Sequence, residues 1–162
     1  MVALKTLIFT ILVPGTVTVY IPYWILSSTS STGDAPLGIA RYFGVILILL
    51  GAAIYFRCAF DFTFKGKGTP APIDPPKELV AQGLYRYVRN PMYVGAFTIL
   101  IGEAMLFESR HLLVYAGLML SCFSLFVLLY EEPVLRRKFG ESYKRYCDEV
   151  PRWIPRLSRR ER

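Results

Sequence analysis

The chain has 162 residues, of which 54% are hydrophobic, and its mean hydropathy is +0.39. A chain of this size cannot bury so many apolar side chains in one core, because small domains keep much of their surface exposed. Part of that surface is therefore expected to face lipid. The net charge is +7, with 19 Lys and Arg against 12 Asp and Glu. Because the positive charge lies beside apolar runs, a membrane surface is favoured as partner over nucleic acid.

Long apolar runs predict an all-α integral membrane protein, since lipid-exposed backbone must satisfy its own hydrogen bonds. A helix of about 20 residues crosses the bilayer core. The first run is expected to be an uncleaved membrane anchor, kinked at Pro14 and Pro22. The third run is the shortest and contains Glu103, which either has a function or faces the outer water. The four predicted spans are residues 4–26, 37–60, 91–107 and 112–130.

The connections between these runs differ in charge. Residues 28–36 contain no Lys or Arg, whereas residues 63–90 contain five and the tail from residue 131 contains ten. Basic segments stay on the cytoplasmic side of membranes. The prediction is a single membrane domain over residues 1–162, with both termini and the 63–90 loop in the cytoplasm. The membrane would be a prokaryotic inner membrane or an equivalent one that faces the cytoplasm.

The start of the tail has an amphipathic pattern. Leu135, Phe139, Tyr143 and Tyr146 recur every three or four residues, and basic residues fill much of the rest. This predicts a cytoplasmic amphipathic helix on the membrane surface, although Gly140 weakens it. The alternative is a tail that only holds the helices against lipid.

Few residues suit metal or disulfide chemistry. Cys58, Cys122 and Cys147 are far apart and are expected to be free thiols that pack as small hydrophobes. His111 is the only histidine and no metal-ligand spacing is present, so no metal site is expected. Arg57 and Asp61 are four residues apart and are predicted to pair on one helix face.

A polar motif, GLYRYVRNPMYVG, precedes the third apolar run at residues 83–95. Asn90 suits the N-cap of a helix and Pro91 its first residue. A helix N-terminus attracts anions, and the guanidinium groups of Arg86 and Arg89 suit a carboxylate or phosphate. The alternative is that Arg and Tyr only fix the end of the span at headgroup level.

A pair of carboxylates, Glu131 and Glu132, is predicted at the end of the fourth span, directly before Pro133. Acidic groups are unfavourable at a helix C-terminus, where the dipole is already negative. The pair is therefore expected to attract a cation. That cation is either an arginine, from Arg136 or the region of Arg86 and Arg89, or a bound cationic ligand.

The two motifs, GLYRYVRNPMYVG and EEPVLRRKFGESYKRYCDEVPRWIP, together resemble the isoprenylcysteine carboxyl methyltransferase and phospholipid methyltransferase group over residues 65–157. The resemblance implies a multi-helix membrane enzyme that uses S-adenosylmethionine bound at the cytoplasmic face. The isoprenylcysteine enzymes usually have His after the motif arginine, where this chain has Asn90. The motif positions are Gly83, Tyr85, Arg89, Asn90, Pro91, Tyr93, Glu131, Glu132 and Tyr143.

The resemblance also implies roles for these residues. The cofactor carboxylate suits Arg89, its ammonium suits Glu131 or Glu132, and its adenine suits Tyr85 or residues 79–83. The predicted acceptor is a lipid-like or lipidated substrate with a carboxylate. The alternatives are a phospholipid amine N-methyltransferase and a non-catalytic lipid-binding protein. The predicted catalytic residues are Arg89, Glu132 and Asn90, and the predicted cofactor-binding residues are Leu79, Val80, Gly83, Tyr85, Arg89, Pro91, Tyr93, Glu131 and Glu132.

Overall fold

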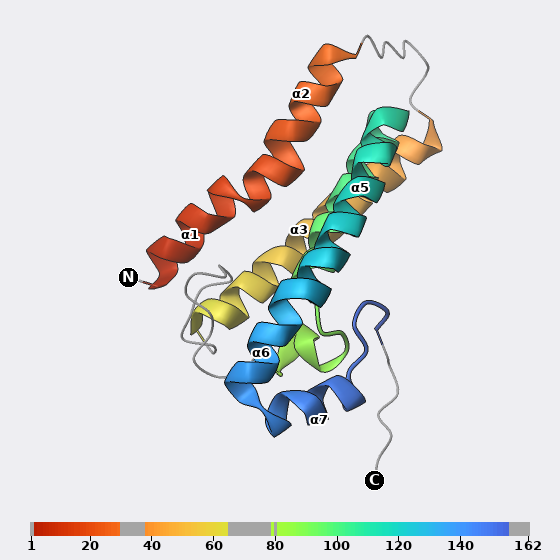
Figure 1. Cartoon of the computed structure of the whole chain (residues 1–162). Helices are drawn as coiled ribbons and strands as arrows, with labels where there is room; N and C mark the ends of the chain where they lie inside the picture. Colours follow the sequence, from red (N-terminus) through yellow and green to blue (C-terminus); the bar gives the residue numbers. More distant parts are fainter. Residues whose placement is uncertain (1, 30–37, 65–78, 80, 156–162) are drawn as a thin grey trace.

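The computed structural model describes residues 2–29, 38–64, 79 and 81–155, and the secondary structure in these ranges is helical (Figure 1). Within these ranges, three helical rods are long and apolar enough to cross a membrane, and α4 is a shorter apolar helix. The predicted all-α membrane fold is confirmed. The elements are α1 (Val2–Leu12), η1 (Thr16–Tyr20), α2 (Ile21–Ser28), α3 (Ile39–Phe64), η2 (Gly83–Arg86), α4 (Pro91–Leu106), α5 (Arg110–Phe126), η3 (Val127–Glu131), α6 (Glu132–Phe139) and α7 (Glu141–Glu149).

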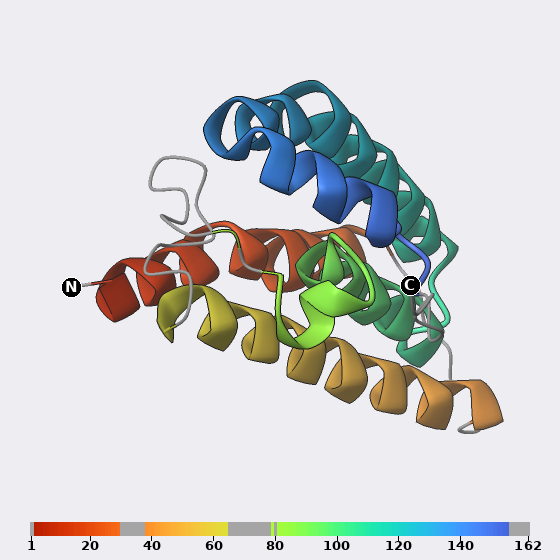
Figure 2. The ribbon, with the colours of Figure 1, turned by 90° about the horizontal axis from the view of Figure 1, so that it is seen from below.

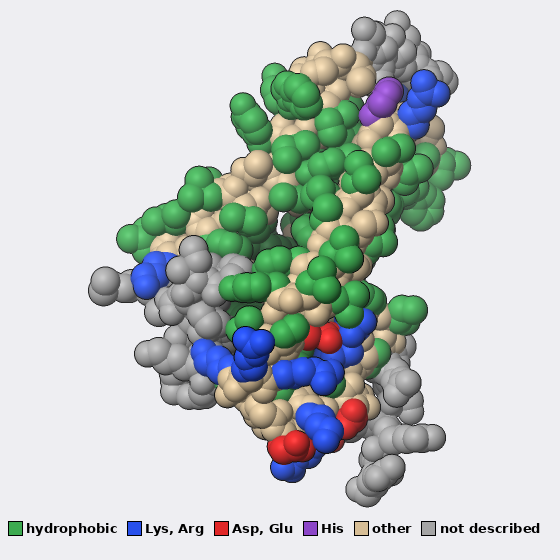
Figure 3. Space-filling model, in the orientation of Figure 1, with side chains coloured by type: hydrophobic (Ala, Val, Ile, Leu, Met, Phe, Trp, Pro, Cys, Tyr) green, Lys and Arg blue, Asp and Glu red, His purple; other side chains and the backbone are tan. Residues whose placement is uncertain are grey.

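Apolar side chains cover the outside of the rods. Trp24 is 63% exposed, and Ile39 and Leu129 are each 75% exposed. Apolar patches of this extent are rare on soluble monomers and indicate a surface that faces lipid. Charged side chains gather instead at the end formed by η2, α6 and α7, which we call the basic end (Figure 3).

The antiparallel helices α3 and α4 pack backbone to backbone through two pairs of glycines. A Cβ atom added at Gly44 would lie 2.6 Å from the carbonyl oxygen of Gly102, and one at Gly51 would lie 2.6 Å from that of Gly95. Each helix thus carries two glycines seven residues apart, and each glycine faces a glycine of the other helix. Small residues at these contacts let membrane helices approach closely. This contact fixes the start of α4 against the C-terminal half of α3.

The rod formed by α1, η1 and α2 crosses the bundle, contacting α3 at one end and α5 at the other (Figure 1). A 3.2 Å hydrogen bond joins the hydroxyls of Thr10 and Tyr55, and those of Thr6 and Thr63 lie 3.1 Å apart. At the other end, Val17, Ile21 and Ile25 pack on the buried cluster of Leu100, Tyr115 and Ala116. Polar contacts therefore hold α1, whereas mainly apolar contacts hold α2.

Each of the two π-helical turns found in the described residues lies just before a proline. In η1 the Ile21 N–H donates to the Thr16 carbonyl ahead of Pro22, and in η3 the Glu132 N–H donates to the Val127 carbonyl ahead of Pro133. Proline lacks an N–H and its ring clashes with the carbonyl four residues earlier. A wider turn relieves that clash and lets the helix continue.

The fourth apolar helix therefore does not end near residue 130, as the sequence analysis expected. The rod runs from Arg110 through Pro133 to Phe139. Glu131 and Glu132 lie inside this rod and not at its C-terminus, so the predicted conflict with the helix dipole is wrong. If a cation lies beside these carboxylates, the helix dipole is therefore not the reason.

The tail forms two helices where one was expected. Gly140 has a φ of +55°, a backbone conformation that favours glycine, and it separates α6 from α7. The bend brings α7 beside η2 (Figure 2), where the Tyr146 hydroxyl reaches the Tyr85 carbonyl. Tyr143, Tyr146 and Val150 form a buried cluster there, against Leu135 and Phe139 of α6.

Candidate functional site

A pocket lies at the basic end, lined by residues from the C-terminal end of α3, from η2 and the N-cap of α4, and from η3, α6 and α7. It encloses about 400 Å³, including space open to solvent. Its lining combines apolar walls with one arginine and one carboxylate and consists of Phe62, Leu79, Tyr85, Arg89, Asn90, Glu131, Leu135, Phe139, Tyr143 and Tyr146.

The η2 turn forms one wall of the pocket and is held from two sides. Gly83 has a φ of +61°, and a Cβ atom there would lie 2.5 Å from Oδ2 of Asp61. The Tyr85 ring packs edge-on against Phe62, with centroids 5.4 Å apart, and the Tyr146 hydroxyl donates a 2.7 Å hydrogen bond to the Tyr85 carbonyl. Gly83 is not among the lining residues, so its observed role is this close approach to α3.

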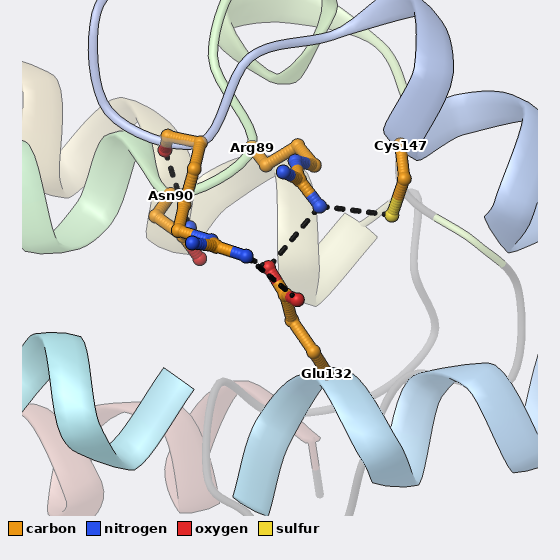
Figure 4. A network of polar contacts seen from close by, with 5 residues as sticks. Arg89, Asn90, Glu132 and Cys147 are labelled. Carbon is orange, nitrogen blue, oxygen red and sulfur yellow. Dashed lines mark hydrogen bonds and ion pairs between the residues drawn. The ribbon is translucent and has the colours of Figure 1, made fainter. Parts of the chain in front are cut away.

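Arg89 and Glu132 join the two sequence motifs directly. The Arg89 Nη1 atom lies 3.1 Å from Oε1 of Glu132 and 2.9 Å from the Cys147 sulfur (Figure 4). Only 12% of the Arg89 side chain and 8% of the Glu132 side chain are exposed. The Arg89 Nε atom is buried and has no hydrogen-bond partner within the described ranges. Arg89 therefore lines the pocket and also retains one buried donor without a partner among the described residues.

A second arginine completes the coordination of Glu132. Arg152 Nε donates to Oε1 at 2.8 Å, and Arg152 Nη2 donates to Oε2 at 3.0 Å. The cation predicted for Glu132 is thus supplied by Arg89, as one alternative proposed, and by Arg152. Arg152 was not predicted as a site residue, although it lies in the PRWIP end of the second motif.

The neighbouring carboxylate, Glu131, has a different environment. It lines the pocket and accepts a 2.8 Å hydrogen bond from the Tyr93 hydroxyl. The Tyr93 ring in turn lies against Phe123, with centroids 5.1 Å apart. Tyr93 therefore orients Glu131 without lining the pocket itself. The structure separates the two adjacent glutamates, since one faces the pocket and the other is enclosed by arginines.

The residues at the start of α4 are only partly as predicted. Pro91 is the first residue of the helix and is fully buried. Asn90 occupies the predicted N-cap position, but its side chain makes no capping hydrogen bond within the described residues. Its Nδ2 donates instead to the carbonyl of Arg152 at 3.2 Å, because the chain after α7 passes beside it.

Other expectations have mixed outcomes. The three cysteines are free, and Arg57 lies 3.6 Å from Asp61 in the predicted pair. Glu103 is not among the residues that line the pocket. Val80 lies outside the described residues. The lining residues that the sequence analysis did not assign to the site, beyond the motif residue Tyr143, are Phe62, Leu135, Phe139 and Tyr146, whose spacing indicated only helix packing.

Comparison with known proteins gives two matches. The chain matches the family described as phospholipid methyltransferase over residues 39–142, more than half of its length. It is also 39% identical over 77 residues to the protein-S-isoprenylcysteine O-methyltransferase of Schizosaccharomyces pombe, a match covering 48% of this chain and 33% of that relative. No solved structure matches significantly. The family match over residues 39–142 contains α3, η2, α4 and the Arg89–Glu132 pair. The chain belongs to the phospholipid methyltransferase family.

Proposed function

We propose that this chain is a membrane methyltransferase that transfers a methyl group from S-adenosylmethionine to a lipid-like or lipidated carboxylate. Family membership and the name of the yeast relative support this proposal. The observation that carries it is Arg89, which lies on the pocket wall with a buried, unpartnered Nε donor among the described residues. A buried donor without an acceptor is unfavourable by about 1–3 kcal/mol, and more when charged, so an anionic ligand group is expected beside it.

The remaining lining residues fit the proposed cofactor. Glu131 presents a carboxylate to the pocket and suits the cofactor ammonium. Arg89 suits a carboxylate, either the cofactor's or the acceptor's. The apolar side chains of Leu79, Leu135 and Phe139 offer surface for the adenine. Bound S-adenosylmethionine would supply an electrophilic methyl group.

The contribution of the protein is orientation and exclusion of water. Arg89 is fixed by Glu132 and Cys147, so it can hold a carboxylate without first reorganising. The apolar walls lower the local dielectric and strengthen the attraction between a carboxylate and a cationic group. A carboxylate nucleophile is already ionised, so no general base is required. Because the basic end contains the pocket, we propose that both the pocket and the two termini lie in the cytoplasm.

The direct test is binding of S-adenosylhomocysteine to the purified chain in detergent, measured by calorimetry. The wild-type chain should bind, and Arg89→Ala should abolish the heat. Arg137→Ala, at an exposed position on α6, is the matched control and should bind as the wild type does. Absence of binding to the folded wild-type chain would contradict the proposal and favour a non-catalytic lipid-binding protein.

A second candidate function is N-methylation of a phospholipid amine. Asn90 at the position where isoprenylcysteine enzymes usually have His favours it, and Glu131 could accept the proton that an amine must lose. Transfer of radiolabelled methyl groups to membranes, followed by alkali, separates the two reactions. A methyl ester releases methanol in alkali, whereas a methylated amine does not.

A further inference from the structure

The chain after α7 passes across the start of α4. The backbone N–H of Arg89 donates to the Pro151 carbonyl at 2.9 Å, and Asn90 Nδ2 donates to the Arg152 carbonyl at 3.2 Å. Val150 is buried with Tyr143 and Tyr146, and the Trp153 ring lies 6.4 Å from that of Tyr93. We call residues 150–153 the C-terminal clasp. The clasp therefore contacts four residues that line the pocket, namely Arg89, Asn90, Tyr143 and Tyr146.

The side chain of the clasp residue Arg152 occupies both oxygens of Glu132. Its two hydrogen bonds, 2.8 Å to Oε1 and 3.0 Å to Oε2, have the bidentate geometry of strong Arg–carboxylate pairs. Oε1 also accepts from Arg89 at 3.1 Å. Both oxygens of Glu132 thus accept from arginines, and Glu132 is not among the residues that line the pocket. Glu132 is therefore a bridge between two guanidinium groups and does not face a ligand.

We propose that Arg152 is a positioning residue for the anion-binding arginine. Arg152 holds the Glu132 carboxylate in place, and Glu132 in turn holds the Arg89 guanidinium group. The inference rests on the proposed function, since Arg89 is the residue proposed to hold the ligand carboxylate. It extends the proposed function to the clasp. Because Glu132 is engaged by arginines, the cationic part of the ligand is assigned to Glu131 instead.

The opposing interpretation is an ordinary surface ion pair. Arg152 is 31% exposed, and exposed pairs contribute little. Glu132, however, is only 6% exposed and has two cationic partners, so loss of one partner changes the geometry of a buried group. The hydrogen bonds to Glu132 also raise the pKa of Arg152, in agreement with a preference for the charged pair.

The test measures S-adenosylhomocysteine affinity by calorimetry for Arg152→Gln, Arg152→Lys and the control Arg145→Gln, which changes an exposed arginine on α7. Arg152→Gln should weaken binding about tenfold or more, as expected when a buried charged partner is lost. Arg152→Lys should fall between Arg152→Gln and the wild type, because lysine keeps the charge and loses the bidentate geometry. Arg145→Gln should leave the affinity unchanged.

A double-mutant cycle separates positioning from general support of the fold. In a Glu132→Gln background, Arg152→Gln should have almost no further effect on affinity, because its route through Glu132 is gone. If Arg152→Gln acted by loosening the backbone contacts of the clasp, it would keep its full effect in this background. Thermal unfolding is recorded for every variant. If Arg152→Gln or the Glu132→Gln background does not fold, Arg152→Lys in the otherwise wild-type chain decides, and wild-type affinity in that variant would overturn the inference.

The outcomes also separate this inference from the proposed function. If the wild-type chain binds no S-adenosylhomocysteine, the proposed function fails. If the wild-type chain binds it and Arg152→Gln binds as tightly as Arg145→Gln, only the role of Arg152 fails.

Discussion

The hydroxyl of Tyr115 on α5 donates a 2.9 Å hydrogen bond to the backbone carbonyl of Val17 in η1. The sequence explains why this carbonyl needs a side-chain donor. In the π-helical turn the Ile21 N–H bonds to the Thr16 carbonyl, and the next residue is Pro22, which has no N–H. Tyr115 therefore supplies the donor that the helix lacks, and it holds the first rod against the bundle.

Removal of this hydroxyl should destabilise the fold. Tyr115→Phe leaves the Val17 carbonyl without its donor in an apolar contact, so the free energy of unfolding should fall by about 1–3 kcal/mol. Thermal unfolding in detergent measures the change, with Tyr130→Phe at an exposed position of η3 as control. In a Pro22→Ala background, where a backbone N–H returns, the Tyr115→Phe effect should shrink. An undiminished effect there would contradict the explanation.

Enlarging the glycines between α3 and α4 should separate these helices. The Cβ atom of Gly51→Ala would lie 2.6 Å from a backbone oxygen, and that of Gly102→Ala 2.7 Å from another, so the backbones must move apart. Each substitution should lower stability by about 1–3 kcal/mol, as overpacking does. Gly117→Ala is the matched control, because no atom lies within 4 Å of its Cβ position. Equal melting temperatures for all three variants would refute this account of the contact.

The two adjacent glutamates should respond differently to neutralisation. Glu132→Gln leaves the side chains of Arg89 and Arg152 facing each other without a carboxylate, and breaking such a buried ion pair typically costs about 3–5 kcal/mol. Glu131→Gln should preserve the fold and weaken S-adenosylhomocysteine binding, because Glu131 faces the pocket. Unfolding and calorimetry on both variants test the distinction. Folding loss in Glu131→Gln alone would reverse the assignment.

Stability should also decline in alkali. Burial raises the pKa of Tyr85, Tyr143 and Tyr146, all at the basic end, above that of an ordinary tyrosine. Below pH 10, about the pKa of an unfolded tyrosine, these phenols are neutral in both states and their contribution is fully present. Above that pH the unfolded chain releases protons that the folded chain keeps, so stability falls as pH rises. Unfolding followed by phenolate absorbance measures this. An unchanged midpoint between neutral pH and strong alkali would contradict the burial of these rings.

Parts of the site could be predicted because they depend on neighbouring residues. A long apolar run must be helical in lipid, and Pro91 suits the first turn of α4. The pairing of Arg89 with Glu132 could be predicted as one alternative from unlike charges near one membrane boundary. Proline misled the prediction at Pro133, because local sequence does not reveal that one wider turn lets the helix continue.

The sequence by itself determined that this is a helical membrane protein of a methyltransferase-like pattern, since apolar length and motif residues are properties of the linear chain. Only the tertiary structure decided which glutamate faces the pocket, that Asn90 turns to the clasp and that Arg152 reaches Glu132. The physical reason is that an ion pair or hydrogen bond between residues 20 to 62 positions apart depends on how helices cross. That crossing is set by the packing of α3 on α4 and by the bend at Gly140.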